Sequence, residues 1–258
     1  MATLSLAVIF GILGNIISLM VYLAPLPTFH RIYKKKATEG FGSLPYLMAL
    51  LSSTLWLYYA LLKRHDAVLL ISINSFGCVI ELIYIVIFIT YAHKDSRNLT
   101  IKIFVAMNMG GLAVALCVSN FALHGPRRLK VLGWICVSVS VFVFASPLSI
   151  MAQVCKTKSV QFMPINLSFF LTFSAIMWFA YGLLIHDLCV AIPNVVGFIL
   201  GILQMVLYCI YRNGEKGVTE QALEAVRVVN PSEVFPIPED DNSNGLQDHQ
   251  DKTLDCPV

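Results

Sequence analysis

The sequence predicts an all-α membrane protein with seven transmembrane helices, arranged as two parallel three-helix repeats joined by a linker helix (3+1+3). Hydrophobic residues make up 57% of the chain and charged residues only 13%, and the mean hydropathy of +0.75 lies outside the range of soluble globular domains. Seven apolar runs are long enough to cross a bilayer core, which takes about 20 residues. The remaining observation is an internal duplication, which groups the spans into two repeats.

The duplication relates residues 25–74 to residues 147–194. Both segments contain, in the same order, a proline, a Lys-x-Lys motif, a second proline, a Trp-x-x-Tyr motif and an asparagine. In the first copy these are Pro25, Lys34, Lys36, Pro45, Trp56, Tyr59 and Asn74; in the second they are Pro147, Lys156, Lys158, Pro164, Trp178, Tyr181 and Asn194. The offset is 122 residues and slips only to 119 at the second proline and 120 at the asparagine, so coincidence is a poor explanation.

The predicted spans are the apolar runs at residues 4–29, 44–62, 67–91, 101–123, 131–154, 164–185 and 188–211. Residues 4–91 form the first three-helix repeat and residues 131–211 the second. A three-helix unit that starts outside ends inside, so a second copy in the same orientation needs one extra crossing. The run at 101–123, which has no counterpart in either copy, supplies it as a linker helix. Residues 212–258 hold ten of the fifteen carboxylates and few apolar residues, and we expect a disordered cytosolic tail.

The distribution of Lys and Arg predicts the orientation. With the N-terminus outside, the inner loops carry eleven of these residues and the outer loops five, which favours an extracellular N-terminus and a cytosolic C-terminus. The basic cluster at residues 127–130 is the exception. The net charge of +3 averages a basic membrane body with an acidic tail, so it does not indicate nucleic-acid binding.

Other function classes find little support in the sequence. The seven cysteines form no C-x-x-C pair or Cys/His cluster, so we expect neither a disulfide framework nor a metal site. Motifs of hydrolytic enzymes such as H-E-x-x-H and G-x-S-x-G are absent, and no cofactor is expected. A seven-helix receptor needs no internal repeat, and the chain has neither a D/E-R-Y triplet nor an N-P-x-x-Y motif at the places a receptor would carry them. We therefore interpret the sequence as that of a transporter.

Paired asparagines and tryptophans are the candidate substrate-binding residues. Asn74 and Asn194 are amides inside otherwise apolar helices, where an amide is costly unless it is satisfied or faces a polar path. An amide both donates and accepts hydrogen bonds, which suits hydroxyl groups, but a membrane asparagine can also pin helices together. Trp56 and Trp178 can hold the flat C–H face of a sugar ring or belong to an interfacial aromatic belt. The matched pairs favour a shared, two-sided site.

The recurring prolines are candidate hinges. Pro25, Pro45, Pro147 and Pro164 are predicted near the cytoplasmic ends of the first, second, fifth and sixth spans. Proline removes a helix hydrogen bond, so these positions are either hinges or simple helix ends. Their recurrence in both copies favours hinges.

Glu81 is the only carboxylate well inside a predicted span, so proton coupling is one hypothesis for it. The corresponding region of the second copy offers only Gln204, and neither a histidine nor a base accompanies Glu81. We therefore prefer a structural role or a role at the cytoplasmic mouth.

Several sequence blocks resemble those of the plant SWEET sugar transporters. They are Leu23-Ala-Pro-Leu-Pro-Thr-Phe29, Lys34-Lys-Lys-Ala-Thr-Glu-Gly40, Ser146-Pro-Leu-Ser149, Lys156-Thr-Lys-Ser159, Phe162-Met-Pro164 and Ala191-Ile-Pro-Asn194. The resemblance extends over residues 5–211 and implies a facilitative, bidirectional sugar carrier of the plasma membrane that works as a homo-oligomer. A carrier of another small solute from the wider PQ-loop superfamily is a rival, but the glutamine of that dipeptide is absent after all four prolines.

The resemblance also implies roles for individual residues. The paired asparagines and tryptophans would line the central sugar pocket, and the four prolines would act as hinges. Tyr59, Tyr181 and Asp187 would close an extracellular gate. The side chains of Ser18, Ser52, Val143 and Ser174 are small, leave volume for a second sugar ring and resemble those of the sucrose-carrying SWEETs. The predicted activity is thus uniport of sucrose, with glucose or fructose as secondary substrates and a proton-coupled symporter as the alternative.

Overall fold

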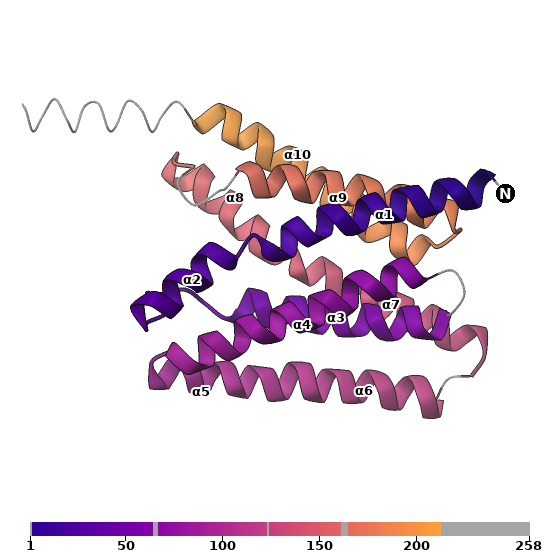
Figure 1. Ribbon diagram of the computed structural model, residues 1–258, viewed down its shortest axis with the longest axis horizontal. Helices are drawn as coiled ribbons and strands as arrows, with labels where there is room; N and C mark the ends of the chain where they lie inside the picture. Colours follow the sequence, from indigo (N-terminus) through magenta and orange to yellow (C-terminus); the bar gives the residue numbers. More distant parts are fainter. Residues whose placement is uncertain (1, 64–66, 123, 161–164, 213–258) are drawn as a thin grey trace, which may run out of the picture. The chain divides into compact units, whose positions relative to one another are not determined.

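The computed structural model describes residues 2–63, 67–122, 124–160 and 165–212, and every regular element in these ranges is a helix (Figure 1). Within them, seven helical spans are long and apolar enough to cross a membrane, which confirms the predicted number. The predicted tail, apart from its first residue, and Pro164 lie outside the described residues.

The first repeat consists of α1 (Ala2–Leu23), α2 (Leu26–Lys35), α3 (Leu44–Lys63) and α4 (Val68–Tyr91), with α1 and α2 forming one span. The second consists of α7 (Pro126–Val143), α8 (Ala145–Thr157), α9 (Ile165–Leu184) and α10 (Leu188–Tyr211), with α7 and α8 forming one span. The linker span is continuous through α5 (Lys94–Ile103), the π-helix η1 (Phe104–Gly111), α6 (Leu112–Cys117) and the π-helix η2 (Val118–Ala122). The predicted 3+1+3 order is confirmed.

The third helix of each repeat packs against both of the others. In the first repeat α4 contacts α1 and α3, and in the second α10 contacts α7 and α9. The repeats meet through two equivalent contacts, α1 with α9 and α3 with α7, as a two-fold relation requires. The linker packs on α3 and α4, at the edge of the first repeat (Figure 1).

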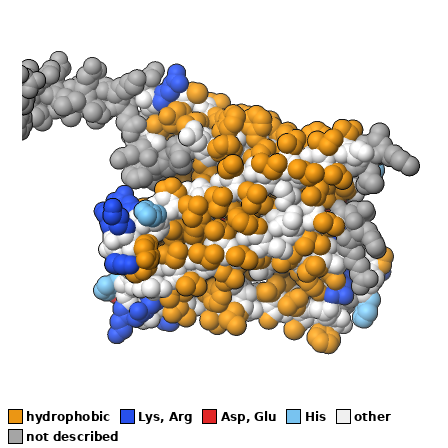
Figure 2. Space-filling model, viewed as in Figure 1, with side chains coloured by type: hydrophobic (Ala, Val, Ile, Leu, Met, Phe, Trp, Pro, Cys, Tyr) orange, Lys and Arg blue, Asp and Glu red, His pale blue; other side chains and the backbone are white. Residues whose placement is uncertain are grey.

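We name the two ends of this helix bundle after the predicted orientation. The inner end is where α2 ends and α5 begins, and the outer end is where α3 ends and α4 begins. On the face shown in Figure 2, Lys and Arg side chains gather at the inner end, and hydrophobic side chains are the most abundant kind over the rest of the coloured area. This pattern suits a body surrounded by lipid with its basic end at an anionic surface.

Three spans differ from the prediction by more than two residues, and one of them is the span formed by α7 and α8, which runs from Pro126 to Thr157 where 131–154 was predicted. The linker span begins at Lys94, not at residue 101, because the polar stretch before the apolar run forms an amphipathic helix. Its inward-facing residue Thr100 is buried, and its hydroxyl lies 2.7 Å from that of Ser43. The first span runs on to Lys35, beyond the predicted end at Phe29, because the chain continues as a helix after a break at Ala24 and Pro25.

The first span of each repeat is broken, between α1 and α2 at Ala24 and Pro25 and between α7 and α8 at Phe144. At Pro25 the chain has no N–H to donate to the carbonyl of Val21, and the N–H of Ala24 bonds that carbonyl at 3.2 Å instead. In the second repeat the break falls at Phe144, whose N–H bonds the carbonyl of Val141 at 3.1 Å, three residues before Pro147. Both breaks therefore tighten the last turn of the outer segment.

Candidate functional site

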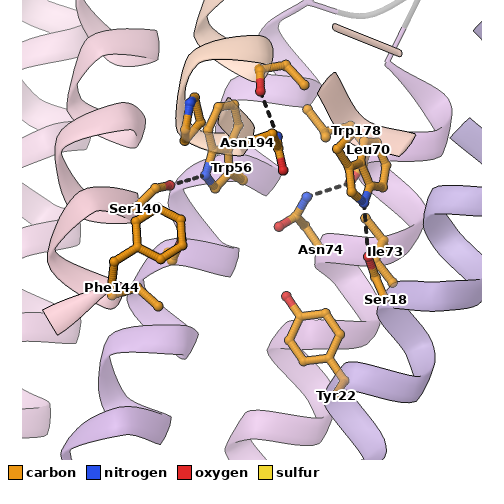
Figure 3. A pocket seen from close by; sticks show the side chains of 14 residues that line it. Ser18, Tyr22, Trp56, Leu70, Ile73, Asn74, Ser140, Phe144, Trp178 and Asn194 are labelled. Carbon is orange, nitrogen blue, oxygen red and sulfur yellow. Dashed lines mark hydrogen bonds between the residues drawn. The ribbon is translucent and has the colours of Figure 1, made fainter. Parts of the chain in front are cut away.

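A cavity of about 220 Å³ lies between the two repeats, near the middle of the spans (Figure 3). It receives residues from all six spans of the repeats and is lined by two asparagines, two tryptophans, three serines and a set of apolar and aromatic side chains. These are Ser18, Tyr22, Ser52, Trp56, Leu70, Ile73, Asn74, Ser140, Val143, Phe144, Trp178, Val190, Pro193 and Asn194. Seven of the eight predicted substrate-binding residues are among them.

The two asparagines are held in the same way. Asn74 donates from Nδ2 to the carbonyl of Leu70 at 2.8 Å, and Asn194 donates to the carbonyl of Val190 at 2.7 Å. Each bond reaches back four residues along the same helix and fixes the orientation of the amide. The two amide oxygens point away from these bonds and toward the space between the repeats (Figure 3). Each amide thus offers an acceptor and a second N–H to a polyhydroxyl ligand.

The indoles are held by serines of the opposite repeat. Trp178 donates from Nε1 to the hydroxyl of Ser18 at 2.9 Å, and Trp56 donates to the hydroxyl of Ser140 at 3.0 Å. Because the ring nitrogens are satisfied by the protein, the faces of the rings are left for contact with a ligand. Each ring also packs edge-on against a tyrosine one turn further along its helix.

Ser140 was not among the residues predicted from the sequence, although the repeat offset indicates its position. Ser140 follows Ser18 by 122 residues, the offset that relates the two tryptophans. The same offset relates Tyr22 to Phe144, which line the cavity beside the two helix breaks. Applying the offset to every candidate residue would have found these positions.

Ser174 does not line the main cavity. Its hydroxyl lies 2.8 Å from that of Ser18, behind the Trp178 indole bond. It borders a neighbouring cavity of about 110 Å³ that shares Phe144 and Asn194 with the main one. This second cavity continues along α10 as far as Gln204, so it extends from the pocket toward the inner end.

At the outer end the two repeats are joined by a contact centred on Asp187. Its carboxylate accepts a hydrogen bond from the hydroxyl of Tyr59 at 2.8 Å and forms an ion pair with Lys63. Asp187 also caps α10, where the N–H groups of Cys189 and Val190 donate to its other oxygen at 3.0 and 3.3 Å. The side chain of Asp187 is 4% exposed, so it links α3 of one repeat to α10 of the other in a largely dry setting. Lys63 was not among the predicted gate residues.

Tyr181, the third predicted gate residue, is buried at the position in α9 that matches Tyr59 in α3. Its ring stands at 87° to that of Trp178, with the ring centroids 5.4 Å apart. Gly11 of α1 lies beside it, and a Cβ added to Gly11 would sit 3.0 Å from the Tyr181 ring. Tyr181 therefore belongs to the contact between α1 and α9.

Arg128 makes a second contact between repeats at the outer end. Its guanidinium donates to the hydroxyl of Tyr58 and to Oδ1 of Asn120, both at 2.6 Å, and to the hydroxyl of Ser119 at 3.0 Å. It therefore ties α7 to α3 and to the linker. Lys63 is paired with Asp187, so two of the five Lys and Arg residues predicted on the outer side are held by neighbouring side chains. These contacts give a structural reason for cations on the side where the charge distribution predicts few.

Three of the four predicted hinge prolines are described, and they lie at or beside helix breaks and starts. Pro25 precedes α2, and Pro45 lies in the first turn of α3. The backbone of Pro147 lies in the first turn of α8. These positions are ones at which the helix is already interrupted, and Pro25 and Pro147 lie within membrane spans rather than at their ends.

Glu81 lies on α4 two turns beyond Asn74, toward the inner end. It is 4% exposed, and its Oε2 has no hydrogen-bond partner among the described residues. By the offset of 120 that relates the asparagines, its counterpart is Gly201 and not Gln204. The carboxyl is therefore a feature of the first repeat alone.

No group of three or more His, Cys, Asp or Glu side chains that could hold a metal occurs in the described ranges.

Comparison with known proteins finds a consistent set of relatives. Residues 8–96 and 130–216 match the model of a family described as "Sugar efflux transporter for intercellular exchange". The chain is 64% identical to Bidirectional sugar transporter N3 of Medicago truncatula over 218 residues, which cover 84% of this chain and 81% of that protein. It is 57% identical to Bidirectional sugar transporter SWEET13 of Arabidopsis thaliana over 206 residues, covering 80% and 70%. The solved structure of a eukaryotic SWEET transporter aligns with a TM-score of 0.77 at 35% identity, covering 83% of this chain and all of that one.

Proposed function

Because this chain belongs to the SWEET family of sugar transporters, we propose that it is a facilitative, bidirectional carrier whose main substrate is sucrose. The family consists of transporters and not of enzymes. The relatives named above are called bidirectional sugar transporters, and they extend over most of this chain. Glucose and fructose are secondary substrates in this proposal.

The observation that carries the proposal is the two-sided pocket. Two amide oxygens face a common space, and two indoles whose N–H groups are already satisfied flank it. A sugar ring has a weakly apolar C–H face and a rim of hydroxyls that donate and accept, which matches an indole above an amide. A carrier must also release its cargo, and a millimolar dissociation constant needs only about −4 kcal/mol. One ring and a few hydrogen bonds supply that much.

The size of the pocket supports sucrose. Ser18, Ser52 and Val143 are small residues in its wall, and Ser174 lies directly behind Ser18. The neighbouring cavity beyond Phe144 adds space for a second ring on the inner side. These small residues resemble those of the sucrose-carrying SWEETs.

We propose alternating access in which residues 4–91 and 131–211 move relative to each other, with the linker span at 101–123 attached to the first repeat. SWEETs are themselves a known instance of parallel repeats of this kind. Tyr59, Tyr181 and Asp187, together with Lys63, act as the outer gate, and the contacts of Asp187 with Tyr59 and Lys63 hold that gate closed. The helix interruptions at Pro25, Pro45 and Pro147, and by repetition Pro164, act as hinges.

Transport is proposed to be uniport. The pocket wall contains amides, indoles and hydroxyls, and none of the residues that line it carries a carboxylate or a basic group. Glu81 lies outside that wall, so a coupled proton has no direct contact with the sugar. The proposal places the protein in the plasma membrane as a homo-oligomer, with its N-terminus extracellular and its C-terminus cytosolic.

The test is transport of labelled sucrose, glucose and fructose by cells that express the protein, measured as both uptake and efflux. Alanine at Asn74, Asn194, Trp56 or Trp178 should abolish transport while surface expression is kept. Asn98→Ala, which removes an exposed amide far from the pocket, is the matched control and should transport normally. Absence of flux for all three sugars in the unmodified protein would contradict the proposal.

A further inference from the structure

The Lys-x-Lys motif that recurs in both copies has a common structural role at the inner end. Its second lysine, Lys36 or Lys158, follows the last residue of α2 or α8 and caps that helix. Both lysines have left-handed backbone conformations, with φ of 54° and 57°. The first lysine of each motif, in contrast, lies within its helix.

Each capping lysine contacts the tyrosine that ends the third helix of its own repeat. Lys36 donates from Nζ to the hydroxyl of Tyr91 at 3.0 Å and lies 4.7 Å from the centre of that ring. Lys158 donates to the hydroxyl of Tyr211 at 2.9 Å and lies 4.8 Å from its ring centre. The lysines are 122 residues apart and the tyrosines 120, the same offsets as in the pocket. The contact is therefore duplicated with the repeat.

Lysine is an unusual residue for these two positions, which indicates that its side chain has a role there. A left-handed residue after a helix is usually glycine, because any Cβ costs energy in that conformation. Lysine stands there in both repeats despite this cost. A position that needed only the turn would be served better by glycine, so the contact with tyrosine explains the residue and the turn alone does not.

Both lysines are charged when they make these hydrogen bonds. Donation to Tyr91 raises the pKa of Lys36 above its ordinary value of 10.5, and donation to Tyr211 does the same for Lys158. A lysine is protonated at cytosolic pH even at its ordinary pKa, and the upward shift extends the charged contact further into basic solution.

We propose that these two lysine–tyrosine contacts are clasps that fasten the inner segments α2 and α8 to the third helix of their own repeat, so that each repeat moves as one body during transport. The first span of each repeat is broken beside the pocket, at Ala24 and Pro25 and at Phe144. Beyond such a break a segment can swing on its own. The clasp fastens the inner end of that segment to the third helix of its repeat. The segment therefore cannot swing alone, and any bending at the break moves the whole repeat. This proposal rests on the alternating-access function proposed above.

Hydrogen exchange of the purified protein tests the clasps without depending on transport. Lys36→Gly should speed amide exchange of residues 26–35 and leave residues 145–157 unchanged, and Lys158→Gly should do the reverse. Glycine is suited to the left-handed turn, so these variants remove the side chain without straining the backbone. If exchange in these segments matches that of the unmodified protein, the clasps do not exist.

Transport then tests their role. The double variant Lys36→Gly/Lys158→Gly should lower the rate of sucrose transport about threefold at equal surface amount, the size expected for the loss of an exposed cation–π contact, and arginine at both positions should preserve the rate. The control is Lys34→Ala/Lys156→Ala, which removes the same charge from the same motifs and should transport normally. An unchanged rate in the glycine variant, or an equal loss in the control, would overturn the role. A failure of the unmodified protein to carry any sugar would instead overturn the proposed function, and hydrogen exchange would still decide whether the clasps form.

Discussion

Replacing Asp187 by asparagine should loosen the closed outer end without unfolding the protein. The carboxylate accepts a hydrogen bond from Tyr59, pairs with Lys63 and caps α10. Asparagine is one of the best helix N-cap residues, so its single oxygen can still accept from the N–H groups of α10, while its NH2 group takes the place of the oxygen that faces Tyr59 and Lys63. The substitution therefore keeps the helix cap and removes the negative charge and the acceptor oxygen opposite Tyr59 and Lys63.

The size of the effect follows from the burial of the pair. The side chains of Lys63 and Asp187 are 17% and 4% exposed, so water screens their interaction weakly. A hydrogen bond to a charged group contributes about 1.5–3 kcal/mol. Losing about 2 kcal/mol would shift the ratio of outer-closed to outer-open molecules roughly 30-fold, since about 1.4 kcal/mol corresponds to a factor of ten.

Access to the pocket from outside reports this shift. Ser52 lines the pocket, and cysteine at that position is close to serine in size. A membrane-impermeant thiol reagent added outside should label Ser52→Cys slowly, and Asp187→Asn should accelerate labelling up to about 30-fold if the reaction is slower than gate movement. Peptide mass analysis separates this label from the native cysteines. Adding Lys63→Gln to Asp187→Asn replaces the unpaired ammonium with a neutral amide and should slow labelling again.

The reasoning would be refuted by a labelling rate that Asp187→Asn leaves unchanged while the reporter cysteine still reacts with a permeant reagent. In that case the contact around Asp187 would be a consequence of closure and would not stabilise it.

Four further predictions address other parts of the molecule. Enlarging Ser52 to Asn and Ser174 to Trp together should reduce sucrose flux more than glucose flux, because the steric penalty falls on the larger ligand; equal loss of both sugars would argue against a size filter. Glu81→Gln should keep downhill sucrose flux, and flux should vary little between pH 6 and 8; accumulation against a sugar gradient that a protonophore abolishes, and that this variant lacks, would establish a symporter instead. Asn98 belongs to a glycosylation sequon on the predicted cytoplasmic side and should carry no glycan in cells; mass analysis that finds one would reverse the orientation. Arg128→Met removes three hydrogen bonds between α7, α3 and the linker, and should raise outside labelling of the Ser52→Cys reporter; labelling equal to that of the unmodified background would show that this cluster does not hold the outer end closed.

Much of the architecture follows from local properties of the sequence. The seven spans are visible because a bilayer requires about 20 apolar residues per crossing and the loops between them are polar. The repeat and its offset indicate which residues occupy equivalent places, and they single out Asn74, Asn194, Trp56 and Trp178, which the structure brings to one pocket. The linker start at Lys94 was missed because an amphipathic helix at a membrane surface reads as a polar loop when only apolar runs are counted.

The partners of these residues depend on packing. Trp56 bonds Ser140 and Trp178 bonds Ser18, in each case across the interface between repeats, because α3 packs on α7 and α1 on α9. A repeat offset gives equivalent positions but not which helices meet.

The sequence by itself therefore determined the number of spans, their grouping into repeats and the residue types at the pocket, since hydrophobic length and duplication are written along the chain. Only the tertiary structure decided that Lys63 pairs with Asp187, that Ser174 stands behind Ser18 rather than in the pocket wall, and that the second lysine of each Lys-x-Lys motif reaches the tyrosine ending its repeat. These contacts join positions from 53 to 156 residues apart. Their geometry is set by how the helices cross, which no local pattern in the chain specifies.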